Sequence, residues 1–169
     1  MTDDYGSFQR LFFGRYPPMG MFEHCVRDLE RIVSTLALPP EIEHTPSTEI
    51  EVCFIGLVAY FESFFRSTFA AVLNIFPDLI HNFSRTRDKR NRDDAMYVRV
   101  DSLLHVEGDV RDSIGCLLSE HLSFTSAQDV NGHYHNLLTI TPFRKAEIPQ
   151  YESILRKRHL VVHHGGIYN

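Results

Sequence analysis

A run of apolar residues from Thr48 to Phe76 limits what this chain can fold into more than any other feature of its sequence. Thr48 and Glu51 have the spacing of a capping box, which predicts that a helix begins there. The helix is expected to end near Ile75, because Pro77 cannot continue it. Apolar side chains occupy almost every face of this helix, so it belongs at the centre of a bundle or in a dimer interface.

The length of this helix would also suffice to span a bilayer. Glu62 and Arg66 lie near its middle, and each costs about 2.5–3.5 kcal/mol at the centre of a membrane. Ser63, Ser67 and Thr68 add further polarity. The sequence therefore favours a helix that is buried within protein.

Several other segments repeat apolar residues at three- and four-residue steps, which is typical of amphipathic helices. Helices are predicted over residues 19–37, 110–122 and 149–166, with a shorter one over 97–106 whose pattern also permits a strand. No segment has a clear preference for strands. The chain is therefore predicted to be an all-α, up-and-down bundle of four to six helices in a single domain, residues 1–169.

The segments between these helices are predicted to be irregular. Residues 1–16 are rich in aromatic side chains without a clear period and are interpreted as an N-terminal arm. Residues 84–95 form a charged loop, for which a solvated surface is favoured over contact with an RNA backbone. Asn131 and Gly132 signal a turn, so the histidines that follow, beginning with His133, are expected to decorate a surface loop.

Composition narrows the class of protein. The 169 residues suit one domain, and a hydrophobic content of 43% is enough for a core. The net charge of −5 excludes a broadly basic nucleic-acid binder, so contact with a polyanion requires a local cationic patch. Cys25, Cys53 and Cys116 match neither a disulfide framework nor a paired-cysteine zinc site. The acidic N-terminus lacks the pattern of a signal peptide, and a cytoplasmic protein is expected.

A local cationic patch of this kind precedes Gly165-Gly166 and comprises Arg156, Lys157, Arg158, His159, His163 and His164. On a helix of about 3.6 residues per turn, His159 and His163 share a face, and Arg158 is long enough to lean toward it. Leu155 and Val162 are expected to anchor the segment in a core. Arginine grips phosphate oxygens in a bidentate way and histidine exchanges protons near neutral pH. The pattern therefore indicates phosphate chemistry.

The order Arg158, polar His159, three further residues and His163 resembles the signature of HEPN domains (higher eukaryotes and prokaryotes nucleotide-binding). The aromatic run over residues 59–66, which contains Glu62, resembles a second helix of many HEPN proteins. This resemblance implies a small helical bundle that dimerises. Many HEPN proteins are metal-independent endoribonucleases of bacterial defence or toxin–antitoxin systems, so the resemblance also implies this activity.

The resemblance further implies roles for individual residues. His163 would be the acid/base group, Arg158 would bind phosphate, and His159 would orient the site. Glu62 is expected to face them, although an i, i+4 pair with Arg66 would also give this carboxylate a partner.

Three cations outside the family pattern are interpreted as substrate contacts: Arg156, Lys157 and His164. The expected function is endoribonuclease activity by attack of the ribose 2′-hydroxyl, at a composite site between two copies of the chain. RNA is the expected substrate, without a cofactor or a metal. A homodimer is expected, with an antitoxin or another regulatory protein as a further partner and no association with a membrane.

Three other interpretations stay open. The spacing of His159 and His163 suits zinc, but Leu160 stands where zinc proteases carry their catalytic Glu, and no third ligand is evident. The cations can instead stabilise the last turn of the helix, by about 0.3–1 kcal/mol each. A HEPN fold that binds a partner or a nucleotide without turnover is the main alternative to catalysis.

Overall fold

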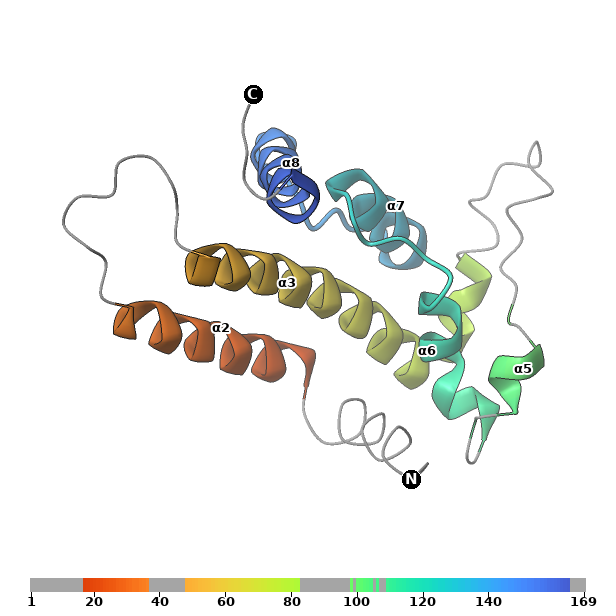
Figure 1. The fold of residues 1–169 in the computed structure, drawn as a ribbon. Coiled ribbons are helices and arrows are strands. Elements are labelled where there is room, and N and C mark those ends of the chain that lie inside the picture. Colours follow the sequence, from red (N-terminus) through yellow and green to blue (C-terminus); the bar gives the residue numbers. More distant parts are fainter. Residues whose placement is uncertain are drawn as a thin grey trace, which may run out of the picture. The chain divides into compact units, whose positions relative to one another are not determined.

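The computed structural model describes residues 17–36, 48–82, 98, 100–104, 106 and 109–164. Its α-helices are α2 (Pro18–Thr35), α3 (Thr48–Ile75), α5 (Val100–Leu103), α6 (Ile114–Ser119), α7 (Ala127–Leu138) and α8 (Ile148–His164), and its 3₁₀ turns are η1 (Pro77–Leu79) and η3 (Val110–Ser113) (Figure 1). The described residues contain no strand, which confirms the predicted all-α class. The predicted N-terminal arm, the charged loop and the Gly165-Gly166 helix stop lie outside the described residues.

The described helices gather into two compact units, and α3 contributes to both. The first unit contains α2, α3 as far as Phe64, and α8 from Pro149 onward. The second unit contains residues 65–148. None of the described helices, α3 included, is long and apolar enough to cross a bilayer. The prediction of one HEPN-like domain stays a prediction.

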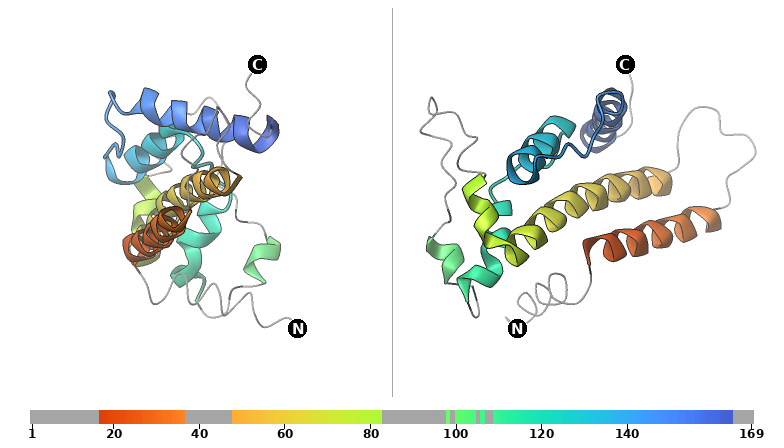
Figure 2. Two further views of the ribbon diagram at one scale, coloured as in Figure 1. Left: turned by 60° about the vertical axis from the view of Figure 1, so that its left-hand side comes forward. Right: turned by 180° about the vertical axis from the view of Figure 1, so that it is seen from behind.

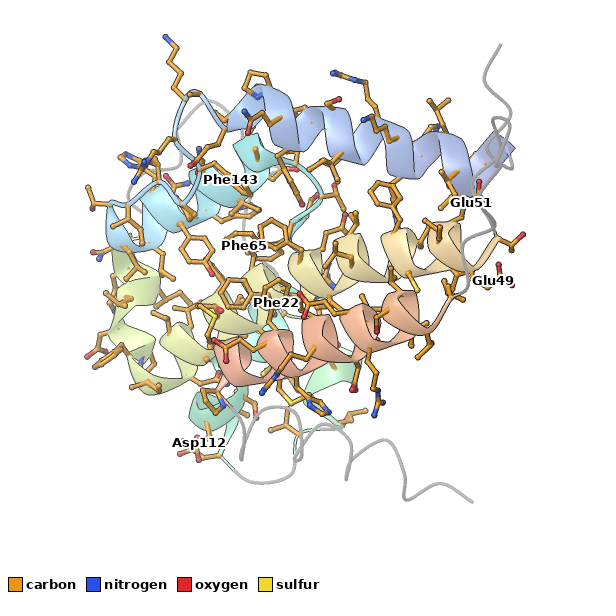
Figure 3. All side chains as sticks on the ribbon, turned by 90° about the vertical axis from the view of Figure 1, so that its left-hand side faces the viewer. Phe22, Glu49, Glu51, Phe65, Asp112 and Phe143 are labelled. Atoms are coloured by element: carbon orange, nitrogen blue, oxygen red, sulfur yellow. The ribbon has the colours of Figure 1, made fainter. Side chains whose placement is uncertain are left out.

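In the first unit, α2 runs antiparallel beside the beginning of α3 (Figure 1, Figure 2). Phe22 of α2 packs against Phe61 and Phe64 of α3, with ring centroids 5.8 and 5.3 Å apart (Figure 3). On α8, Tyr151 meets the ring of Phe61 edge-on at 5.5 Å. Both neighbouring helices are therefore held to α3 through Phe61, as expected for a helix that is apolar on most sides.

In the second unit, the later turns of α3 form a separate aromatic core. Phe69 is completely buried and contacts the rings of Phe124 and Tyr134, with centroids 5.6 and 6.1 Å away. One turn earlier, Phe65 contacts Tyr134 at 6.0 Å and Phe143 at 5.3 Å (Figure 3). The Tyr134 hydroxyl donates to the Phe65 carbonyl oxygen at 2.9 Å, so this buried polar group is satisfied.

The turn predicted at Asn131-Gly132 is wrong, because both residues lie inside α7. Ser126 caps this helix, since its hydroxyl accepts a hydrogen bond from the Asp129 N–H at 3.0 Å. The Asn131 side chain then donates to the Phe143 carbonyl oxygen at 2.9 Å and accepts from the Phe143 N–H at 2.8 Å. These tertiary hydrogen bonds offset the poor helix propensity of the Asn-Gly pair.

The prediction that the histidines after Gly132 lie in a surface loop is also wrong, because His133 and His135 lie on α7. The ring of His133 packs against Phe69 and Phe124, with centroids 6.2 and 5.1 Å away. Its Nε2 lies 2.7 Å from the Ser123 carbonyl oxygen. His133 is therefore a structural residue of the second unit, whereas His135 is exposed.

The single helix predicted over residues 110–122 is instead the turn η3 followed by the short helix α6. The Gly115 N–H donates to Asn74 Oδ1 of α3 at 2.7 Å. Asn74 thus satisfies one of the N–H groups that are unpaired at the start of any α-helix, and this contact accounts for where α6 begins. A Cβ atom on Gly115 would overlap the Ala70 carbonyl oxygen, so only glycine permits this approach to α3.

The contrast between two helical glycines tests this packing. Gly115→Ala should lower the free energy of unfolding by about 2–3 kcal/mol or more, because the backbone of α3 cannot yield to the added methyl group. Gly132→Ala should raise it by about 0.5–1 kcal/mol, because nothing lies within 4 Å of a Cβ there and alanine is the better helix former. Urea denaturation followed by circular dichroism measures both, and equal effects of the two substitutions would contradict the close contact.

Candidate functional site

The predicted motif lies on α8, in the first unit, and the predicted helix over 149–166 is observed as far as His164. Its buried anchor is Tyr151, which is only 6% exposed. Leu155 is half-buried, but Val162 is 44% exposed, so the prediction that Val162 anchors the motif in a core is wrong. Val162 lies eleven residues beyond Tyr151, about 16 Å further along the helix than the contact with Phe61.

His159 and His163 share an exposed face of α8, as their spacing predicted. Their ring centroids are 4.4 Å apart and the ring planes are inclined by 47°. At this separation the rings are in contact, so no phosphate group fits between them. Arg156 and Lys157 are also exposed. The side chain of His164 lies outside the described part of the chain.

Arg158 is half-buried, in contrast to its exposed neighbours. It follows Tyr151 by seven residues, which is two helical turns, so the two residues share a face of α8. The Arg158 Nε atom is excluded from solvent and has no hydrogen-bond partner among the described residues. The positive charge of Arg158 acts on the Tyr151 hydroxyl, whose pKa it lowers. The Nε of Arg158 is therefore enclosed within the protein, whereas the side chains of the two histidines are exposed.

Glu62 of α3 reaches the same buried region. Its Oε1 atom and the Tyr151 hydroxyl are both excluded from solvent. Burial, followed by the negative charges of Glu62 and Glu152, raises the pKa of Tyr151 to about 12, against the opposite effect of Arg158. The structure therefore brings Glu62 and Arg158 within electrostatic reach of one buried hydroxyl.

Arg66, the alternative partner considered for Glu62, belongs to the second unit. Its guanidinium carbon lies 5.8 Å from the centre of the Phe124 ring, which is the distance of a cation–π contact. An exposed pair of this kind contributes about 0.5–1 kcal/mol. Arg66 therefore has a structural role of its own on the far half of α3.

Tyr151 lies on α8 but outside the motif from Arg158 to His163, so the motif does not indicate it. The signal that was available is its spacing of seven residues from Arg158, which puts both on one face of a helix. Its proximity to Glu62 depends on how α8 packs on α3, and no local pattern reports that.

The described residues contain no group of three or more His, Cys, Asp or Glu side chains that could hold a metal ion. Within the described part of one chain, His159 and His163 therefore offer two ligands at most. A structural zinc site normally has four protein ligands and a catalytic one three.

Comparison with protein-family models, with curated proteins and with solved structures finds no match to this chain. The HEPN resemblance therefore stays an expectation that depends on Arg158, His163 and Glu62. The chemistry of the site is argued from the residues that the structure brings together.

The raised pKa of Tyr151 predicts a pH dependence of stability. A hydroxyl whose pKa is higher in the folded state than the unfolded value of 10.0 stabilises the fold fully below pH 10, and this contribution is lost as the pH rises to about 12. Tyr151→Phe should remove about 1 kcal/mol of that alkaline loss of stability. Urea unfolding of both proteins between pH 8 and pH 11 measures the difference, and parallel pH profiles would count against a buried, charged environment for Tyr151.

Proposed function

We propose that the C-terminal half of α8 is the catalytic surface of a metal-independent endoribonuclease of HEPN type, completed by a second copy of the chain. The observation that carries this proposal is the exposed pair of His159 and His163 rings in contact on α8, with the half-buried Arg158 next to them in the sequence. Imidazole supplies general acid/base catalysis, and a guanidinium stabilises charge that develops on phosphate oxygens. By the resemblance, the activity would serve bacterial defence or a toxin–antitoxin system.

In the proposed reaction, His163 removes the proton from a ribose 2′-hydroxyl, and the freed oxygen attacks the adjacent phosphorus. The bond from phosphorus to the 5′-oxygen breaks, and a second imidazole gives that oxygen a proton. Arg158 stabilises the negative charge on the non-bridging oxygens. The products are a 2′,3′-cyclic phosphate and a 5′-hydroxyl, so the step needs neither a metal nor a redox partner.

The arrangement of the histidines supports a site shared between two copies. The attacking and leaving oxygens lie on opposite sides of the phosphorus, so the base and the acid must do so too. His159 and His163 lie in contact on one face of one helix and cannot flank a phosphate. A two-fold dimer would bring a second His163 to the opposite side. The exposed Val162 beside His163 is an apolar side chain that such a partner would cover.

The charge distribution supports a polyanionic substrate. The chain as a whole carries −5, yet Arg156 and Lys157 are exposed on the same helix as the histidine pair. Local cations of this kind bind phosphates without reading base sequence, and salt weakens them. They would hold the RNA backbone on either side of the cleaved bond.

The proposal is tested by incubating the purified protein with a mixed RNA pool in EDTA. Cleavage should persist and should leave 2′,3′-cyclic phosphate ends that mass spectrometry identifies. His163→Ala should lower the rate by about 100-fold or more, since it removes the general acid/base group. Arg158→Ala should lower the rate by a similar factor. His135→Ala removes an exposed histidine from α7 and is the matched control, which should keep the full rate.

Circular dichroism should show that each variant keeps the helical content of the parent protein. Full activity of His163→Ala, or loss of the parent activity in EDTA, would contradict the proposal. A strictly monomeric protein in sedimentation experiments would contradict the shared site. A dimer that cuts no RNA but binds a second protein tightly would favour the non-catalytic module instead.

A further inference from the structure

His159 and His163 bring two imidazole rings into contact on α8, and the proposed reaction does not use that contact. We propose that this histidine pair is a two-ligand site for a divalent transition-metal ion such as Zn²⁺, and that the bound ion switches the proposed ribonuclease off. The metal site follows from the geometry of α8 alone, whereas its effect on RNA cleavage rests on the proposed function.

The two rings lie close to the separation that one shared ion requires. Zinc binds imidazole nitrogens at about 2.0–2.1 Å in tetrahedral geometry, so two ligating nitrogens lie about 3.3 Å apart and the centroids of their rings about 5 Å apart. The observed centroids are 4.4 Å apart and the ring planes are inclined by 47°. Because the two residues are one turn apart within α8, rotation of the side chains alone brings a nitrogen of each ring to a common ion.

An ion can reach this histidine pair from solvent, because both side chains are exposed. His163 also lies in the last turn of α8, where backbone carbonyl groups give the helix end a partial negative charge that favours cations. The described residues contribute no third His, Cys, Asp or Glu to the group, so water completes the coordination of the ion. Two protein ligands hold an ion exchangeably, which suits a regulatory ion better than a structural one.

The neighbouring charges restrict which cations bind. Arg156 and Lys157 are exposed on the same helix and repel a cation. Binding therefore depends on the coordination bond to imidazole and not on attraction by charge. Imidazole suits zinc, copper and nickel ions, whereas magnesium and calcium ions prefer oxygen ligands. We therefore expect Zn²⁺ to bind to the histidine pair and Mg²⁺ not to bind.

A bound ion would block the proposed reaction at its first step. A neutral imidazole has one nitrogen that accepts a proton, and the lone pair of that nitrogen is also the one that binds a metal ion. His163 therefore cannot remove the proton from a ribose 2′-hydroxyl while it holds the ion. Cleavage would resume when the ion leaves, because the site itself is unchanged.

The metal site is tested by titrating Zn²⁺ into the full chain, previously stripped with EDTA and dialysed, in a calorimeter. His159→Ala and His163→Ala should each weaken binding at least about tenfold, since a single imidazole lacks the second ligand that the helix holds at high effective concentration. The imidazole signals of both residues should shift in NMR spectra of the parent protein as Zn²⁺ is added.

Two further variants are matched controls. His24 Nε2 lies 3.5 Å from Asp28 Oδ2 on α2, so this pair is a competing place for an ion, and His24→Ala should leave the Zn²⁺ affinity unchanged. His159→Ala combined with Lys157→His keeps the number of histidines but separates the two rings by six residues, on different sides of the helix. This combined variant should bind Zn²⁺ as weakly as His159→Ala does.

A second arm measures RNA cleavage by the stripped protein. Zn²⁺ at ten times its Kd should lower the rate about tenfold by mass action, and an excess of EDTA should restore it. Mg²⁺ at the same concentration should leave the rate unchanged. His159→Ala keeps His163 but lacks the second ligand, so its remaining activity should be insensitive to that concentration of Zn²⁺.

The two arms separate the metal site from the proposed function. Absence of Zn²⁺ binding, or binding of equal strength in the parent protein and in His159→Ala, would overturn the metal site, whatever the protein does to RNA. Binding that depends on both histidines, in a protein that cuts no RNA, would preserve the metal site and refute the ribonuclease. Cleavage that saturating Zn²⁺ leaves unchanged or accelerates would refute the regulatory role.

Discussion

The burial of one aromatic column on α3 is the interaction on which the rest of the structure depends. Phe61, Phe65 and Phe69 follow one another at four-residue steps and therefore lie along one side of the helix. Phe61 meets α2 and α8 in the first unit, while Phe65 and Phe69 meet α7 and its neighbouring segments in the second. Phe65 and Phe69 are buried and Phe61 is half-buried. A fully buried ring contributes roughly 1.5–3 kcal/mol, so α3 contributes to the packing of both units.

The polar groups that lie near these aromatic rings differ between the two units. In the second unit, the Tyr134 hydroxyl and the Asn131 amide bond to backbone groups, so they stabilise the fold. In the first unit, the buried polar atoms belong to two charged side chains and a tyrosine, Glu62, Arg158 and Tyr151. Burial of a charged group costs free energy unless the group is paired with an opposite charge or binds a ligand. The proposed site therefore lies in the unit that buries polar atoms of charged side chains.

Local sequence signals were sufficient for the long helices. The spacing of Thr48 and Glu51, with Pro77, predicted a helix from Thr48 to about Ile75, where α3 is observed. The apolar period predicted α2 to within two residues at each end. Local sequence signals failed where a residue distant in the sequence determines the backbone conformation. Asn131 is helical because it bonds a residue twelve positions away, and α6 begins where Asn74, 41 positions away, caps Gly115. Asn-Gly and an apolar period carry no information about such partners.

For the candidate site, the sequence by itself determined that α8 is a helix and that His159 and His163 lie together, because residues four apart on a helix are always neighbours. Only the tertiary structure decided that Arg158 is half-buried and that its Nε, like Glu62 Oε1 and the Tyr151 hydroxyl, is excluded from solvent. The physical reason is that the spacing of residues along one helix is local, whereas the burial of a side chain depends on how that helix packs, as Tyr151 of α8 does on Phe61 of α3.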